Sequence, residues 1–111
     1  MDRLKDIFNK LYGSFPYLGT LCFVDTETTG LGKDAKIIEI GAIAVWYDGI
    51  DVQFDTFETL INPGFKIDQK ITELTKIANE DLNTAPGDEV YDDFAKWFIS
   101  KNINKCIAHN A

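Results

Sequence analysis

Hydrophobic and polar residues follow two different periods along this chain, and each period predicts a type of element. Residues 4–12 place apolar side chains at helical spacing with charged residues between them, so we expect a short amphipathic helix. Gly13 should end this helix. The pattern then changes to the apolar run Leu21–Val24, which is typical of a strand covered on both faces. We therefore expect a lead-in over residues 1–18 and a folded domain over residues 19–111.

Two further strands are predicted in the middle of the chain. One is the segment rich in Ile and Val at residues 36–47 (KIIEIGAIAVWY), and the other is residues 52–61 (VQFDTFETLI). Asp48-Gly49 between them offers the positive-φ pair that a tight hairpin prefers, so the two strands should be antiparallel neighbours. Asn62-Pro63-Gly64 should end the third strand, because proline has no N–H for the ladder.

The second half of the chain predicts helices and then a last strand. Residues 68–82 are typical of two short helical pieces, and Ala85-Pro86-Gly87 separates them from a longer helix. Asp88 is the candidate N-cap of that helix, whose apolar side chains share one face: Val90, Phe94, Trp97 and Phe98. Residues 105–111 (KCIAHNA) begin as a short apolar strand, which a crossover would place parallel to an earlier strand. The predicted class is α/β or α+β with a mixed sheet.

Length and composition limit the architecture to one soluble domain. The chain has 111 residues, of which 45% are hydrophobic and 26% charged, as in globular proteins. No apolar run approaches the roughly 18 residues of a membrane span. The first ten residues contain charges that a signal-peptide core does not tolerate: Asp2, Arg3, Lys5, Asp6 and Lys10. We expect a cytoplasmic protein without a membrane partner.

The charge and the cysteines exclude some further classes. With a net charge of -7, the chain has no global basic field for a polyanion, although bound cations and a few lysines can reverse the sign at one site. Cys22 and Cys106 are far apart and lack CxxC spacing, so neither a zinc site nor a disulfide framework is indicated. We interpret both as small core residues in a reducing compartment.

Candidate chemistry begins directly after the first apolar run, at Asp25-Thr26-Glu27. Side chains alternate along a strand, so the two carboxylates should point to the same side of the sheet, close enough to share a hard cation. Two such acids need a metal, an arginine or good hydrogen bonds to stay charged together. An isolated D-x-E pair is also consistent with a strand that simply ends in solvent.

The wider sequence resembles the DEDD family of 3′-to-5′ exonucleases, and within it the subgroup that includes the proofreading subunit of bacterial DNA polymerase III. Five blocks carry the resemblance in the expected order: FVDTETTGL at 23–31, IIEIGAIAV at 37–45, LINPG at 60–64, ITELTKI at 71–77 and IAHNA at 107–111. The resemblance implies an RNase H-like fold, in which an antiparallel three-strand meander and a crossover helix lead to a fourth strand beside the first.

The resemblance also implies a two-metal mechanism. In this family four acidic residues hold two divalent ions, usually Mg²⁺ or Mn²⁺, which activate water and stabilise charge on the phosphate and the departing 3′ oxygen. Asp25 and Glu27 match the first two ligands, and Thr26 would offer backbone or hydroxyl contacts to the terminal nucleotide. The implied substrate is a single-stranded or frayed 3′ end, and polymerase subunits are possible partners in DNA replication or repair.

Other matching positions have weaker assignments. Thr75 and Ile77 match the family's 3′-terminal nucleotide pocket, but Thr75 is equally consistent with a helix cap and Ile77 with a core residue. Lys76 stands between them where a glycine is common, so this lysine either contacts phosphate or alters the turn. Lys66 and Lys70 flank the same segment and are also consistent with a solvated face.

Three residues are expected to support the site without binding metal directly. Glu39 resembles a family glutamate behind the first ligands, and as an acid in an apolar strand it needs a donor. His109 and Asn110 match the start of the second motif, whose aspartate would come just after Ala111. The family's general base is a histidine of a later motif, so we interpret His109 as supporting.

With half of the expected ligands present, we expect a truncated exonuclease domain that is a poor nuclease by itself. The competing hypothesis is a non-catalytic interaction or nucleic-acid-binding module that keeps the fold, with its exposed apolar surface covered by a partner or a second copy. The motifs do not decide between DNA and RNA.

Overall fold

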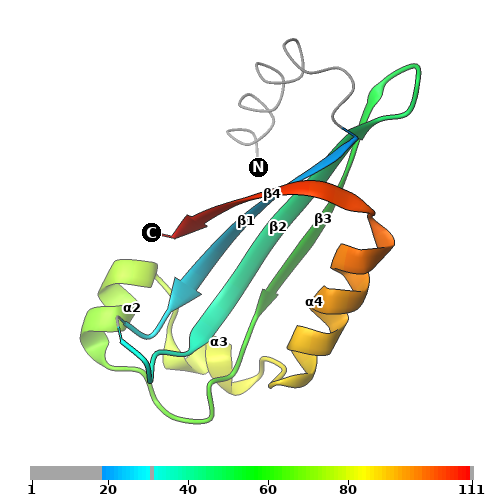
Figure 1. Ribbon diagram of the computed structural model, residues 1–111. Helices are drawn as coiled ribbons and strands as arrows, with labels where there is room; N and C mark the ends of the chain where they lie inside the picture. The colour runs from blue at the N-terminus through cyan, green and yellow to red at the C-terminus, as the bar shows by residue number, and fades with distance from the viewer. Residues whose placement is uncertain (1–18, 31, 111) are drawn as a thin grey trace.

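One mixed sheet of four strands, in the order β3-β2-β1-β4, forms the centre of the computed structural model, which describes residues 19–30 and 32–110. The strands are β1 (Thr20–Thr28), β2 (Ile37–Tyr47), β3 (Val52–Leu60) and β4 (Ile103–Asn110). β1 and β3 each pair antiparallel with β2, and β4 pairs parallel with β1. Figure 1 shows the resulting twisted sheet. The predicted meander and the parallel fourth strand are both confirmed.

The sheet has two chemically different faces because side chains alternate along each strand. We call one the carboxylate face; on β1 it contains Leu21, Phe23, Asp25 and Glu27, and on β2 their register partners Val45, Ile43, Gly41 and Glu39. The other, the α4 face, contains Cys22 with its register partners Ala44 and Cys106. Leu21, Phe23, Ile43 and Val45 form a buried cluster, so the carboxylate face is apolar at one end and acidic at the other.

Helix α4 (Glu89–Ser100) packs on β3 through aromatic side chains, as its apolar spacing predicted. The Phe94 ring lies 5.3 Å from that of Phe57 and 5.9 Å from that of Trp97. Trp97 Nε1 donates a 3.0 Å hydrogen bond to Asp55 Oδ2, which also forms a 2.6 Å ion pair with Lys101 Nζ. These contacts attach the crossover helix to the sheet before the chain enters β4.

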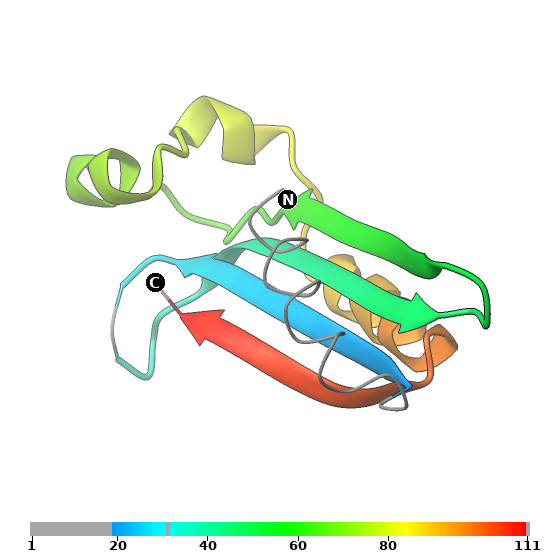
Figure 2. The same cartoon turned by 90° about the horizontal axis from the view of Figure 1, so that it is seen from above.

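The two predicted helical pieces are present as α2 (Gln69–Thr75) and α3 (Asn79–Asn83). They lie beyond the end of the sheet at which β1, β3 and β4 finish (Figures 1 and 2). Ile38 of β2 is fully buried there in one cluster with Ile67, Ile77 and Leu82. The pairing of β1 and β2 is irregular next to this point: Glu27 faces Glu39 whereas Thr28 faces Ile37, so Ile38 is an extra residue, as in a β-bulge.

Two local predictions are wrong. The β2–β3 connection is a four-residue loop, since Tyr47 pairs with Val52, and Gly49 is its only residue at positive φ. The Asp48 carboxylate shapes this loop by accepting bonds from the N–H groups of Ile50 and Asp51, both at 2.8 Å. Because Asp48 acts through its side chain, a positive φ at that residue is not needed.

The capping prediction for α4 is wrong as well. Asp88 occupies the N-cap position of α4, yet its side chain makes no capping hydrogen bond. The neighbouring Glu89 instead accepts a 3.0 Å bond from Gly87 N, and the two backbone bonds that it receives hold the pKa of this carboxyl below its usual range. The first turn of α4 therefore contains acidic side chains as predicted, but Glu89 and not Asp88 accepts the local backbone hydrogen bond.

The cysteine interpretation holds for only one of the two residues. Cys22 is buried, whereas Cys106 is exposed on β4. Both are free, and although they are far apart in sequence they are register partners on adjacent strands. Burial, together with the neighbouring Cys106, raises the pKa of the Cys22 thiol to about 12. The two cysteines are neighbours although they are distant in sequence, because the crossover brings β4 beside β1.

The helix predicted over residues 4–12, and the whole 1–18 lead-in, lie outside the described residues. Within the described part of the chain, no helix has the length and apolar character needed to cross a bilayer.

Candidate active site

The predicted metal ligands lie within β1, close to its C-terminal end. Asp25 is paired with Gly41 of β2 on one side and with His109 of β4 on the other. Glu27 is paired with Glu39. Because Asp25 and Glu27 are two residues apart on one strand, both belong to the carboxylate face, as the alternation predicted.

No partner neutralises these two carboxylates among the described residues. Neither side chain forms a hydrogen bond or an ion pair there, and the one salt bridge, Lys101–Asp55, lies on the opposite face. Asp25 is exposed and Glu27 half-buried. Two neighbouring carboxylates that accept no hydrogen bond from a described residue can bind an external cation.

Glu39 shows the electrostatic cost of gathering acids at this position. Burial raises the pKa of its carboxyl above the usual range, and the negative charges of Glu27, Glu58 and Asp25 raise it further, in that order. Glu39 is an acid without a described donor, so the predicted hydrogen-bonding partner is not found in this part of the chain. It contributes negative potential behind the two ligands.

Glu58 is a fourth carboxylate that sequence reasoning missed. It lies on β3 opposite Gly41, which in turn lies opposite Asp25, so the row Glu58, Gly41, Asp25 crosses three strands on the carboxylate face. Gly41 places no side chain between the two acids, and a Cβ built there would meet only Asp25 O, at 3.8 Å. Glu58 could have been identified from the pairing of β2 with β3. That pairing can be predicted only when the length of the loop between the two strands is known.

The nucleotide-contacting candidates are more dispersed. Thr26 lies between the ligands in sequence, so its side chain belongs to the α4 face. Ile77 is buried in the cluster around Ile38. The Thr75 hydroxyl donates to Ile71 O at 2.8 Å and accepts from Ile77 N at 3.2 Å, so both of its bonds are local.

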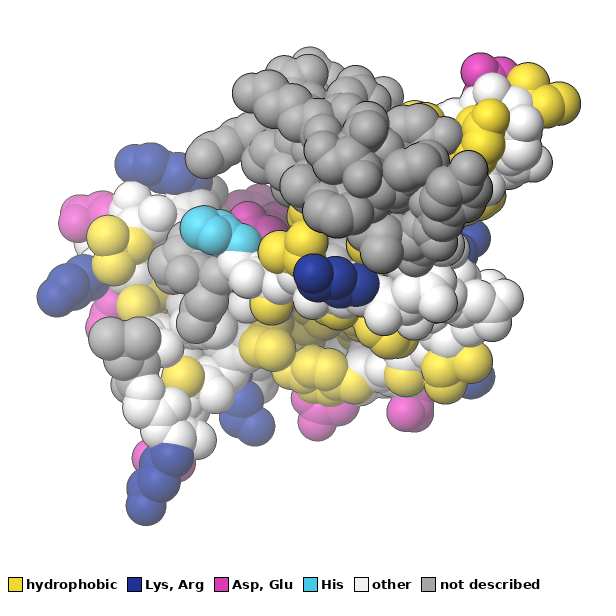
Figure 3. Space-filling model, turned by 45° about the horizontal axis from the view of Figure 1, so that its top comes forward, with side chains coloured by type: hydrophobic (Ala, Val, Ile, Leu, Met, Phe, Trp, Pro, Cys, Tyr) yellow, Lys and Arg dark blue, Asp and Glu magenta, His cyan; other side chains and the backbone are white. Residues whose placement is uncertain are grey.

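His109 and Asn110, the two candidates on β4, lie beside the site because β4 pairs with β1. His109 is exposed and shares the row of Asp25, so it belongs to the carboxylate face. Figure 3 shows the histidine beside acidic side chains. Asn110 pairs with Thr26 at the end of the strand. The structure thus brings Asp25, Glu27, Glu39 and His109 together on one face, and it leaves Thr75 and Ile77 with α2 and the turn after it.

A divalent cation fits this donor set, although weakly. Carboxylate oxygens are the ligands that Mg²⁺ and Mn²⁺ prefer, and Asp25 with Glu27 offers two groups on one face. In the described part of the chain, no three or more His, Cys, Asp or Glu side chains are arranged to hold one ion. A cation held by two carboxylates keeps most of its waters.

A family comparison identifies the class of protein to which this fold belongs. Residues 22–111 match the RNase T family of exonucleases, so the chain belongs to this exonuclease family. The family assignment suggested by the five sequence blocks is confirmed.

Particular relatives narrow the resemblance. The chain is similar to the PolC-type DNA polymerase III of Clostridium perfringens, at 44% identity over 89 residues, which cover 78% of this chain and 6% of that protein. The PolC-type polymerase of Thermotoga petrophila is 38% identical over 107 residues, 95% of this chain and 7% of that protein. This chain therefore spans only a small fraction of the length of these relatives.

Solved structures confirm the fold. Cell-death related nuclease 4 (CRN-4) superposes with a TM-score of 0.68 at 20% identity, over 82% of this chain and 35% of that chain. The nuclease domain of 3′hExo, a DEDDh family member bound to rAMP, gives a TM-score of 0.66 at 18% identity, over 85% of this chain and 52% of that one. The sheet and helices described here thus have the RNase H-like fold of these exonucleases.

Proposed function

We propose that this chain supplies the first metal-binding half of a 3′-to-5′ exonuclease site that acts on DNA ends. The observation that carries the proposal is the placement of Asp25 and Glu27 on one face of β1 with no described donor bound to either. The PolC-type relatives support DNA as the substrate and a role in replication or repair, with polymerase subunits as partners.

The reaction is hydrolysis of the terminal phosphodiester. A water oxygen forms a bond to phosphorus, the bond from phosphorus to the 3′ oxygen of the preceding nucleotide breaks, and that oxygen leaves with a proton. Bound Mg²⁺ or Mn²⁺ would supply the Lewis acidity that favours hydroxide and stabilises the developing negative charge. Asp25 and Glu27 would hold the cation, and Glu39 and Glu58 would strengthen the negative potential around it.

Other residues would position the substrate. In this proposal Thr26 serves the terminal nucleotide through its backbone, and Thr75 and Ile77, whose side chains are engaged within the fold, shape the turn beside it. His109 and Asn110 support the β4 side of the site. Two carboxylates hold one cation weakly and offer no adequate cage for a second, so efficient hydrolysis requires ligands beyond those described here.

The decisive test is metal binding by the folded chain. A ligand that binds only the native state raises its stability, so millimolar Mn²⁺ should raise the midpoint of thermal unfolding of the wild type. Asp25→Ala should abolish this rise, together with any Mn²⁺-dependent shortening of a 5′-labelled oligonucleotide. Asp51→Ala, in the loop at the other end of the sheet, is the matched control and should behave as the wild type. An unchanged Mn²⁺ response in Asp25→Ala would refute the site.

The absence of a three-ligand cluster among the described residues favours one alternative, a non-catalytic interaction module. This alternative predicts no Mn²⁺ shift together with self-association in analytical ultracentrifugation. A metal response that depends on Asp25 in a monomeric chain would exclude it.

A further inference from the structure

Lys76 occupies a backbone conformation that does not suit it. Its φ of 65° and ψ of 18° lie in the left-handed region, where a side chain collides with its own carbonyl oxygen and glycine is preferred. Among the described residues the other non-glycine residue at positive φ is Asn102, and asparagine tolerates this region well. A lysine side chain cannot offset the cost of this conformation by a local hydrogen bond to the backbone.

The turn itself does not need a lysine. Lys76 N donates to Thr72 O at 2.8 Å, which ends α2 in the usual way. Thr75 Oγ1 accepts from Ile77 N, and Ile77 is buried in the core cluster around Ile38. These neighbours hold the backbone in place whatever side chain stands at position 76, and glycine would suit the turn better. The strain therefore points to a function of the exposed ammonium group.

The charges around this turn indicate what the ammonium group binds. Most lysines of the described residues lie in the β1–β2 connection and in the segment that includes α2: Lys33, Lys36, Lys66, Lys70 and Lys76. Figure 3 shows lysine side chains gathered toward the end of the molecule where α2 lies. The same segments contain only three acids, and Asp68 among them is occupied as the cap of α2, accepting from Ile71 N. These two segments are thus net basic in a chain whose net charge is -7, whereas α3, which follows them, contains the acids Glu80 and Asp81.

None of these lysines is neutralised by an ion pair with another described residue, since the one salt bridge in this part of the chain joins Lys101 to Asp55. The basic region also lies at the end of the sheet where β1 finishes, just after Asp25 and Glu27 (Figure 1). A phosphodiester chain that approaches the carboxylates is repelled by them, and cationic side chains beside its path offset that repulsion.

We propose that Lys76 binds a backbone phosphate of a single-stranded nucleic acid whose 3′ end reaches the carboxylate face, with Lys66 and Lys70 extending the same path. This inference rests on the proposed function, because the carboxylate site defines where the 3′ end lies. Lys76 is a positioning residue: it contacts the substrate backbone away from the reacting bond. Lys76 is exposed at the C-terminal end of α2, where its side chain is accessible to a strand in solution.

The test separates charge from strain at one position. Lys76→Gly and Lys76→Asn remove the charge in residues that tolerate the turn, and Lys76→Arg retains it. The probe is a 5′-fluorescent oligodeoxythymidylate, titrated by fluorescence anisotropy at several salt concentrations in Ca²⁺. We expect Lys76→Gly and Lys76→Asn to weaken binding by about threefold to tenfold at low salt and to reduce the salt slope by about 0.7, the value for one phosphate contact on a single strand. Lys76→Arg should bind as the wild type.

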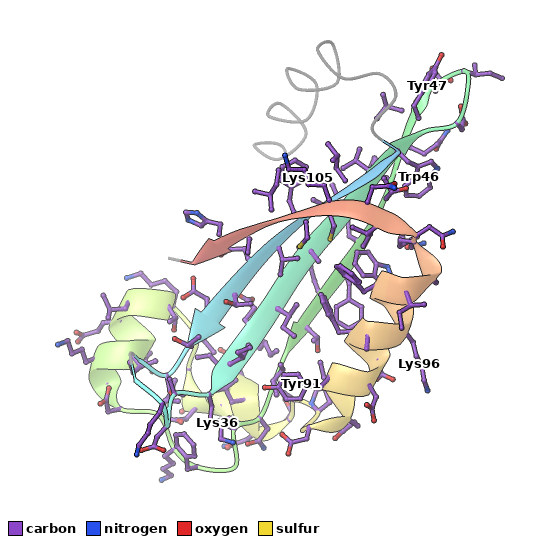
Figure 4. All side chains as sticks on the ribbon, viewed as in Figure 1. Lys36, Trp46, Tyr47, Tyr91, Lys96 and Lys105 are labelled. Atoms are coloured by element: carbon purple, nitrogen blue, oxygen red, sulfur yellow. The ribbon has the colours of Figure 1, made fainter. Side chains whose placement is uncertain are left out.

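The control is Lys96→Asn, because Lys96 lies on α4 and points away from the sheet (Figure 4). This control should leave binding unchanged. Lys76→Gly should also raise the midpoint of thermal unfolding by roughly 2–5 °C, so that a more stable protein binds less well. Weaker binding with higher stability cannot result from partial unfolding.

Several outcomes would overturn the inference: wild-type affinity in both neutral variants, an equal loss in Lys96→Asn, or no binding of the oligonucleotide by the wild type at low salt. Failure here is distinct from failure of the exonuclease proposal. The Mn²⁺ response of Asp25→Ala tests the metal site alone, and the salt slope of Lys76→Gly tests the phosphate contact alone.

Discussion

The two faces of the sheet treat their acidic residues in opposite ways. On the α4 face, Asp55 is paired with Lys101 and accepts a hydrogen bond from Trp97, and these two partners, in that order, hold the pKa of its carboxyl below the usual range. On the carboxylate face, Glu39 receives no described donor, and burial with neighbouring acids raises the pKa of its carboxyl. An acid that serves the fold is neutralised within it, whereas acids gathered at the expense of stability are typical of a functional site.

The largest effect on stability is expected on the α4 face, when the aromatic packing that covers it is removed. Phe94→Ala should lower the free energy of unfolding by about 3 kcal/mol, because the Phe94 ring contacts Phe57, Trp97 and Phe98. Denaturant titration followed by tryptophan fluorescence measures this loss. Phe65→Ala is the control, since Phe65 is 50% exposed and should cost well under 1 kcal/mol. Similar losses in the two variants would show that α4 contributes little to the core.

Removal of the Asp55 charge should have a smaller effect with a defined pH dependence. Asp55→Asn should cost about 1 kcal/mol at pH 7, because the carboxyl is partly exposed and its ion pair is screened. The folded pKa of Asp55 lies below its ordinary value of 3.8, so its stabilisation is complete above that value and disappears as pH falls through the lower folded pKa. Thermal unfolding of wild type and variant between pH 7 and pH 2 should therefore converge at the acid end. A difference that persists at pH 2 would mean that packing, not charge, explains the loss.

The smallest effect is expected on the carboxylate face, and it has the opposite sign. Glu39→Gln should leave stability unchanged or raise it by a few tenths of a kcal/mol at pH 7 in the absence of divalent ions, because it removes repulsion from Glu27, Glu58 and Asp25. Equilibrium unfolding at low ionic strength gives this difference, and added salt should reduce it. Marked destabilisation would identify Glu39 as a structural acid with a partner of its own.

Much of the architecture was predictable because its signals are local. The apolar runs of β1 and β2, the breakers around Pro63 and Pro86, and the apolar face of α4 all depend on residues close in sequence. The predicted placement of Asp25 and Glu27 on one face succeeded for the same reason, since alternation along a single strand is sufficient.

The features that sequence reasoning missed depend on register between distant segments. Glu58 joins the acidic row only because a four-residue loop aligns it with Gly41. Cys106 lies beside Cys22 only because the crossover ends with β4 next to β1. The left-handed backbone of Lys76 was indicated only by the family resemblance, in which a glycine is common at this position, because a lysine by itself does not indicate a positive φ.

The extra residue in β2 connects the helical pair α2 and α3 to the carboxylate face along the main chain. Ile38 is the fully buried residue of the cluster that holds α2 and α3, and the next residue, Glu39, is the register partner of Glu27. Because the two residues are neighbours in the chain, the position of Glu39 along β2 depends on where the helical cluster holds Ile38.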